Sequence, residues 1–118
     1  MANVVFDESF ASFFVNISVE EAEKVVLKSN IGASFAIKGK NQINFPENKK
    51  CVVMVVEKYF TRVDNYAAGT IIIDNALNKT RVQIIAAGGG KGIAGADWGS
   101  EDKFEGEIES AFIDYIID

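Results

Sequence analysis

The stretch "CVVMVVEKYF", Cys51–Phe60, decides the fold because it is the first of three consecutive segments with the composition of β-strands. The other two are "AGTIIIDN", Ala68–Asn75, and "TRVQIIAA", Thr80–Ala87. All three are rich in β-branched residues, which favour strands. The connections "TRVDNYA" and "ALNK" are short and polar, as between neighbouring antiparallel strands. The sequence therefore predicts an antiparallel meander.

The residues before the meander predict a strand, a helix and a second strand. Ser9–Ile17, "SFASFFVNI", is rich in Phe, Val and Ile and reads as the first strand. Ser18 and Glu21 have the spacing of a capping box, and the apolar residues that follow recur at helical spacing. They predict a helix over Val19–Ser29. Ala33–Ile43, "ASFAIKGKNQI", alternates loosely and predicts a strand at the edge of the sheet.

The C-terminal residues predict a second helix. Ser100 is a suitable N-cap, and acidic residues in the first turn complement the helix dipole. One apolar stripe runs along the predicted helix, made of Phe104, Ile108, Ala111, Phe112, Tyr115 and Ile116.

The predicted order β-α-β-β-β-β-α favours an α+β fold in which both helices cover one face of a single antiparallel sheet. We expect one domain over residues 1–118. The order of elements is similar to that of the TATA-binding-protein-like fold, of which the helix-grip domains are enlarged versions. That likeness implies a shape and no activity.

Composition and charge exclude several partners and compartments. The net charge of −5 opposes binding to nucleic acid or to an anionic membrane, both of which need clustered Lys and Arg. The N-terminus lacks the pattern of a secretory signal, and no apolar run is long enough to cross a membrane. The single cysteine, Cys51, agrees with a reducing compartment. We expect a cytoplasmic protein.

The residue types that carry most catalysis are scarce. The chain has no histidine and one cysteine, so it lacks the commonest general base and cannot assemble a zinc site from these ligands. We expect no metal and no cofactor, and enzymatic activity is not favoured. Any catalysis would depend on Asp, Glu, Lys, Tyr or the thiol with shifted pKa values.

Alternation along the strands predicts two unlike sheet faces. The face toward the helices carries Val52, Met54, Val56 and Phe60 from the first of these strands, and neighbouring strands add Ile71, Ile73, Val82 and Ile84. The opposite face carries Val53, Val55, Glu57, Tyr59, Thr70, Ile72, Asp74, Arg81, Gln83 and Ile85. Its apolar content favours a homodimer interface, although strand propensity alone would explain the same residues on an exposed sheet. Glu57, Asp74 and Arg81 are expected to pair across strands.

The stretch Ala86–Asp102, "AAGGGKGIAGADWGSED", holds six of the ten glycines. It lacks both common phosphate-binding glycine patterns, and its acidic residues would repel an anion. A joint anchored by Trp98, or a lid over a pocket beside the last helix, is favoured instead. The candidate pocket residues are Gly88, Gly89, Gly90, Lys91, Trp98 and Tyr115, and Lys58 or Arg62 could add a polar anchor.

Four short motifs carry a resemblance to a known family: Glu57-Lys58-Tyr59, Thr80-Arg81, Gly88-Gly89-Gly90 and Asp97-Trp98-Gly99. Together they resemble a family of small bacterial proteins, mainly from Firmicutes, known as domain-of-unknown-function family 6054. The resemblance covers roughly Val52–Ile117, with a weaker match before it. This chain departs in its longer N-terminus and in the lysine after the glycine triplet. The resemblance implies no mechanism.

Three functions remain open. The first is a non-catalytic module that, as a monomer or a dimer, binds a small apolar or amphipathic molecule between sheet and C-terminal helix, or another protein. The second is a structural homo-oligomeric subunit without a ligand. The third is a hydrolase or isomerase that uses Glu57, Tyr59 and Asp74. A cavity above roughly 300 Å³ under the glycine-rich loop would favour the first, and a closed core the second.

Overall fold

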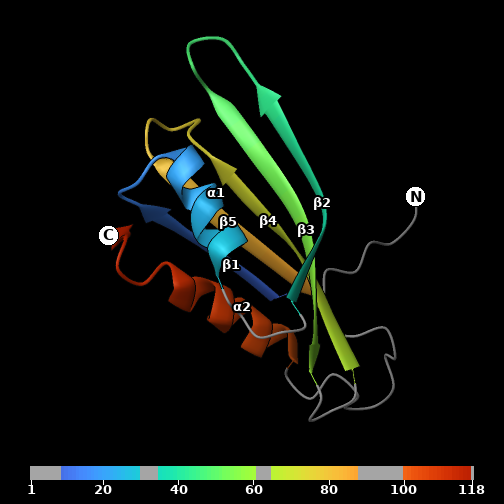
Figure 1. Cartoon of the computed structure of the whole chain (residues 1–118). Coiled ribbons are helices and arrows are strands. Elements are labelled where there is room, and N and C mark those ends of the chain that lie inside the picture. The colour runs from blue at the N-terminus through green and yellow to red at the C-terminus, as the bar shows by residue number, and fades with distance from the viewer. Residues whose placement is uncertain (1–8, 30–34, 61–64, 88–99, 118) are drawn as a thin grey trace, which may run out of the picture.

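The computed structural model of the chain describes residues 9–29, 35–60, 65–87 and 100–117. These residues form an α+β structure with one six-stranded antiparallel sheet and two helices (Figure 1). The elements are β1 (Ser9–Val15), α1 (Val19–Lys28), β2 (Phe35–Asn44), β3 (Lys50–Phe60), β4 (Asn65–Asp74), β5 (Thr80–Ala87), α2 (Ser100–Ala111) and β6 (Ile116–Ile117).

The strands lie in the order β2-β3-β4-β5-β1-β6. Strands β2 to β5 form the predicted meander, with β2 at one edge of the sheet. Strand β1 pairs with β5, so the first and the fifth strands are neighbours. The β3–β4 hairpin extends to Asn65, which is three residues before the predicted start of that strand.

The C-terminal prediction was wrong at its end, because Tyr115 and Ile116 do not continue the helix. Helix α2 ends at Ala111, and three backbone hydrogen bonds of the i→i−3 type tighten the turn after it, from the amides of Phe112, Ile113 and Tyr115. Ile116 and Ile117 then form β6 along the free edge of β1. Two β-branched residues beside unpaired strand edge groups gain more from pairing than from another helical turn.

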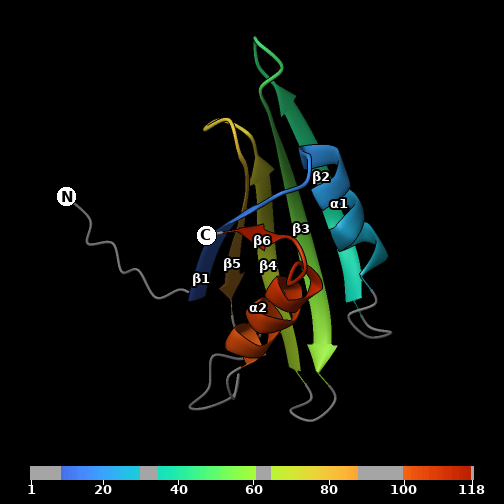
Figure 2. The ribbon, with the colours of Figure 1, turned by 90° about the vertical axis from the view of Figure 1, so that its left-hand side faces the viewer.

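Both helices cover one face of the sheet, as predicted (Figures 1 and 2). Helix α1 buries Val19, Ala22 and Val26, and α2 buries Phe104, Ile108 and Phe112. Seven of the eight predicted inward residues of the central strands are fully buried beneath them: Val52, Met54, Val56, Ile71, Ile73, Val82 and Ile84. The side chain of the eighth, Phe60, lies outside the described part of the chain. This common core fixes the helices on the sheet.

Aromatic rings fill the space between α2 and the sheet. Gly69 of β4 lies under Phe104, and a Cβ atom at position 69 would lie 2.8 Å from Phe104 Cε2. The Phe104 ring also stacks on Phe35 with 6.3 Å between ring centroids, and Phe112 packs on Phe13 at 5.7 Å. The core beside the described part of α2 is thus closed by side chains.

Candidate functional site

The sheet face opposite the helices, here called the outer face, carries the residues predicted for it. The strand register places the residues that define this face on one side of the sheet: Phe10, Ser12, Phe14, Asn41, Ile43, Cys51, Val53, Val55, Glu57, Tyr59, Ala68, Thr70, Ile72, Asp74, Arg81, Gln83 and Ile85. Neither α1 nor α2 packs on this side. The outer face is therefore a broad surface that the described helices leave uncovered.

Exposed apolar side chains lie across the outer face. Phe10 on β1, Ile43 on β2 and Val55 on β3 expose 49%, 41% and 45% of their surface, respectively. Val53, Ile72 and Ile85 lie between them and are partly buried by their neighbours. A sheet face that meets only water usually alternates to polar residues, so this composition is typical of a covered face.

The outer face also carries one structural ion pair. Arg81 Nε donates to Asp74 Oδ2 at 3.0 Å, and a second guanidinium nitrogen lies 3.3 Å from Oδ1. The Ala76 amide also donates to Oδ1, and Asp74 is only 5% exposed. Both oxygens of this carboxylate have partners, so Asp74 is held as a structural group.

Glu57 lies far from this pair, although the sequence suggested that the three charges meet. Glu57 stands opposite Ala68, whereas Asp74 stands opposite Cys51, six residues away along β3. That separation is about 20 Å at about 3.3 Å per residue. The candidate catalytic set of Glu57, Tyr59 and Asp74 is thus not brought together, and the carboxylates cannot act on one small substrate.

Cys51 lies beside Asp74 at the start of β3 and is partly buried. Burial raises the pKa of its thiol above the usual value of 9.0, and the Asp74 carboxylate raises it further. The thiol is therefore protonated at neutral pH, which agrees with a packing role.

The predicted pocket residues are only partly within the described chain. Six of them lie outside the described residues: Arg62, Gly88, Gly89, Gly90, Lys91 and Trp98. Tyr115 follows the C-terminal end of α2 and packs against the core. Lys58 pairs with Glu107 of α2. The two described residues thus serve packing and the attachment of α2.

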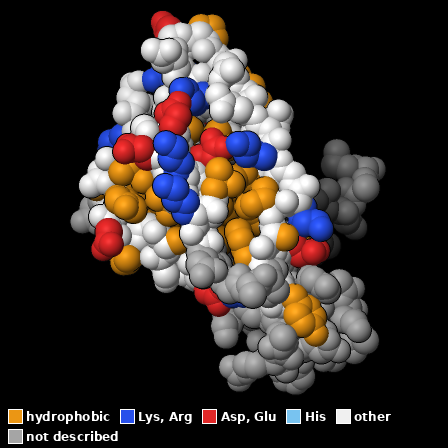
Figure 3. All heavy atoms as spheres, viewed as in Figure 1, with side chains coloured by type: hydrophobic (Ala, Val, Ile, Leu, Met, Phe, Trp, Pro, Cys, Tyr) orange, Lys and Arg blue, Asp and Glu red, His pale blue; other side chains and the backbone are white. Residues whose placement is uncertain are grey.

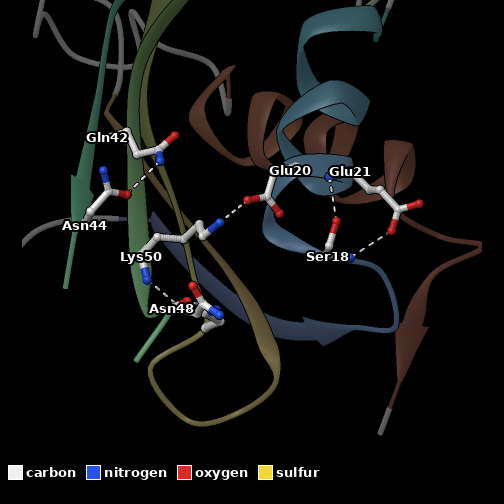
Figure 4. A network of polar contacts seen from close by, with 8 residues as sticks. Ser18, Glu20, Glu21, Gln42, Asn44, Asn48 and Lys50 are labelled. Carbon is white, nitrogen blue, oxygen red and sulfur yellow. Dashed lines mark hydrogen bonds and ion pairs between the residues drawn. The ribbon is translucent and has the colours of Figure 1, made fainter. Parts of the chain in front are cut away.

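A polar groove of about 570 Å³ lies at the end of the sheet where β2 turns into β3, β4 turns into β5, and α1 begins. Figure 4 shows Lys50 of β3 reaching toward Glu20 in the first turn of α1, where the two form an ion pair. Lys49 Nζ donates a hydrogen bond to Asn78 Oδ1 from the neighbouring turn. The groove therefore joins three segments that are distant in sequence.

The start of α1 is fixed by the predicted capping box. Ser18 Oγ accepts from the Glu21 amide and Glu21 Oε1 accepts from the Ser18 amide, each at 3.0 Å (Figure 4). The Lys50 ammonium lowers the pKa of the Glu20 carboxyl, and the backbone amide of Glu20 contributes to the same shift. A negative charge is thus already favoured at this helix end.

Sequence reasoning missed the groove, although its components were visible. The capping box marked the helix start, and the turns "ENKK" and "NALNK" are rich in Asn and Lys. In an antiparallel meander, the turns after β2 and β4 lie at the same end of the sheet. Only the pairing of β1 with β5 adds the start of α1 to that end.

The helix-covered side of the molecule has a different character. Figure 3 shows acidic and basic side chains interspersed with hydrophobic ones over this side. Lys40 of β2 pairs with Glu23 of α1 there. Within the described ranges, no group of three His, Cys, Asp or Glu side chains could hold a metal ion, and neither helix is long and apolar enough to cross a membrane.

A family model matches nearly the whole chain. The model of a family described as "Family of unknown function (DUF6054)" matches residues 4–116. No curated protein and no solved structure matches the chain.

Proposed function

The chain belongs to the DUF6054 family of unknown function, and we propose that it is a non-catalytic interaction module that self-associates through its outer face. The observation that carries this proposal is the set of exposed apolar side chains on a sheet face that the described helices leave bare. A second copy is the partner that this surface fits, because identical patches meet across a two-fold axis.

The outer face is large enough for a stable dimer. Five strands at about 4.8 Å spacing, with about seven residues each at about 3.3 Å, give a flat area on the order of 500–600 Å². Relief from side chains adds to that value. Specific interfaces bury about 600–1,000 Å² on each partner, so the face reaches this range without help from the helices.

Charge supports association on this face. The chain as a whole carries a net charge of −5, which opposes self-association in general. Among the residues that define the outer face, Glu57, Asp74 and Arg81 are charged, and the last two neutralise each other. The Lys79 ammonium adds one positive charge beside Phe14, opposite in sign to Glu57. Little like-charge repulsion would therefore act between two copies.

The small-molecule-binding and hydrolase hypotheses receive less support. An apolar ligand between the sheet and α2 would have to displace Phe104, which fills that space over Gly69. A carboxylate hydrolase would need Glu57 and Asp74 close together, and the strand register separates them. The likeness to the TATA-binding-protein-like and helix-grip folds remains part of the proposal. It is supported by β1 lying beside β5 and by both helices covering one face.

Native mass spectrometry and light scattering of two matched variants test the proposal. Val55→Glu places a charge within the outer face, on β3, and Leu27→Glu places the same charge on α1, where Leu27 is similarly exposed at 48%. We expect dimers for the wild type and for Leu27→Glu, and monomers for Val55→Glu with an unchanged circular dichroism spectrum. A monomeric wild type, or a dimeric Val55→Glu, would overturn the proposal.

A further inference from the structure

We propose that the polar groove at the start of α1 binds a phosphate group. This inference goes beyond self-association, since the groove and the outer face use different side chains. The site combines a buried hydroxyl that no described residue hydrogen-bonds, a helix N-terminus and an excess of basic over acidic side chains around one hollow.

Thr80 is the observation that points to a ligand. It is only 8% exposed, it lines the groove, and its position opposite Val15 in the sheet places its side chain on the helix side. The side-chain hydrogen bonds among the described groove residues are made by Ser18, Glu20, Lys49, Lys50, Asn75 and Asn78, and none of them uses the Thr80 hydroxyl. Because leaving a buried hydroxyl unpaired costs about 1–3 kcal/mol, a polar group in the groove would stabilise this side chain.

The first turn of α1 adds a preference for negative charge. The helix has ten residues, and its first residues, Val19 and Glu20, line the groove. The capping box uses the amides of Ser18 and Glu21, so an anion at this end would meet the helix dipole and the amides of Val19 and Glu20. The Glu20 carboxylate contacts its own amide and Lys50, so it occupies the position that a bound phosphate would take.

Replacing the Glu20–Lys50 ion pair by a contact between Lys50 and a ligand would cost little free energy. The Glu20 side chain is 55% exposed, and exposed ion pairs contribute at most about 1 kcal/mol. Each lysine ammonium has three donors, so Lys49 and Lys50 keep donors beyond those used for Asn78 and Glu20.

The lining carries a positive excess. Three lysines, Lys49, Lys50 and Lys79, stand against two glutamates, Glu20 and Glu47. The Lys79 ammonium lies 5.2 Å from the centroid of the Phe14 ring on the outer face, so it adds long-range charge and no direct contact. If a phosphate displaced the Glu20 carboxylate into solvent, the net positive charge of the groove lining next to the ligand would increase.

The volume of the groove suits a phosphate that is part of a larger organic molecule. A groove of about 570 Å³ lies within the range of roughly 300–1,000 Å³ that small-molecule sites occupy. Inorganic phosphate would fill only part of it. Asn48, Asn75 and Asn78 line the remainder, and their amides suit a polar organic group.

Nuclear magnetic resonance titrations of the full ¹⁵N-labelled chain test this inference. Inorganic phosphate and glycerol 3-phosphate are added separately at constant ionic strength, with sodium chloride as the reference. We expect saturable shifts of the Val19, Glu20 and Thr80 amides with both phosphates and none with chloride. Tighter binding of glycerol 3-phosphate would identify a phosphate carried on an organic molecule, and equal affinity would identify free phosphate.

Three variants assign the contacts. Lys50→Gln and Thr80→Val should weaken binding about tenfold and about fivefold, as expected for a charge-assisted and a neutral hydrogen bond. Glu20→Gln should tighten it several-fold, because the competing carboxylate is removed.

Lys40→Gln is the matched control, since Lys40 forms the same kind of ion pair with α1, to Glu23, outside the groove lining. It should leave the affinity within about twofold. The proposal would be overturned by absence of saturable shifts, by an equal loss in Lys40→Gln and Lys50→Gln, or by unchanged affinity in Thr80→Val. Circular dichroism confirms that each variant is folded.

Discussion

At the scale of single residues, Gly69 is the position where the fold depends most directly on a missing side chain. Its Cα faces the Phe104 ring, and an added Cβ would also lie 3.1 Å from the Ile85 carbonyl oxygen. The carbonyl belongs to the neighbouring strand and cannot move aside without disturbing the sheet. Gly69 thus lets Phe104 approach the sheet closely.

Gly69→Ala should therefore destabilise the protein by about 1–3 kcal/mol, the usual cost of overpacking a dense core. Gly106→Ala is the control, because position 106 is exposed in α2 and an added Cβ meets nothing within 4 Å. It should stabilise by up to about 1 kcal/mol through helix propensity. Urea unfolding of the two variants and the wild type measures both changes in the free energy of unfolding. Equal stabilities of the two variants would contradict the close contact of position 69 with Phe104.

The Glu20–Lys50 pair gives a second residue-scale prediction, on pH. The pKa of the Glu20 carboxyl is lowered from 4.5 chiefly by its hydrogen bond with Lys50. Because the folded-state value is depressed, the stabilisation by Glu20 is present at pH above 4.5 and is lost as the pH falls through the folded-state pKa. Since the carboxyl is mostly solvent-exposed, the effect on stability is small.

Lys50→Met should return the pKa of Glu20 toward 4.5, whereas Lys40→Met should leave it unchanged. A ¹³C titration of the Glu20 side-chain carboxyl carbon measures the value directly. An unchanged titration midpoint in Lys50→Met would show that the pair does not persist in solution.

At the scale of elements, α1 depends on its N-terminal cap. The helix has only ten residues, too few to be stable alone in water, and it is held by the capping box and by three buried side chains. Ser18→Ala removes the acceptor for the Glu21 amide and should cost about 0.5–2 kcal/mol.

Ser110→Ala is the matched control, since Ser110 is exposed near the end of α2 and caps no helix start. It should be neutral or slightly stabilising, because alanine has the higher helix propensity. Thermal unfolding followed by circular dichroism compares the two. Equal changes in melting temperature for the two variants would mean that the Ser18 cap does not stabilise α1.

At the scale of the whole molecule, the outer face links stability to concentration. If folded copies associate through this face, mass action raises the melting temperature as the protein concentration rises. Val55→Glu should abolish that dependence, and Leu27→Glu should keep it. Differential scanning calorimetry over a hundredfold range of concentration provides the test. A melting temperature that is independent of concentration in the wild type would argue against self-association in this range.

The sequence by itself determined the local elements and the division of the sheet into two faces. The capping box located the start of α1 at Val19, and the predicted end, Ser29, lies one residue beyond the observed end at Lys28. Thr80–Ala87 was predicted with its observed bounds. Alternation in Cys51–Phe60 assigned Val52, Met54 and Val56 to the core. These features depend on neighbours along the chain, through capping, helical spacing and the two-residue period of strands.

Only the tertiary structure decided which distant residues meet. It paired Asp74 with Arg81 and left Glu57 about 20 Å away along β3, at about 3.3 Å per residue. It also placed Ile116, which the sequence assigned to the end of a helix, in an edge strand with Ile117. Thr80, Lys50 and the start of α1 share one groove for the same reason. Strand register and sheet order fix such proximities, and both depend on packing across the whole core.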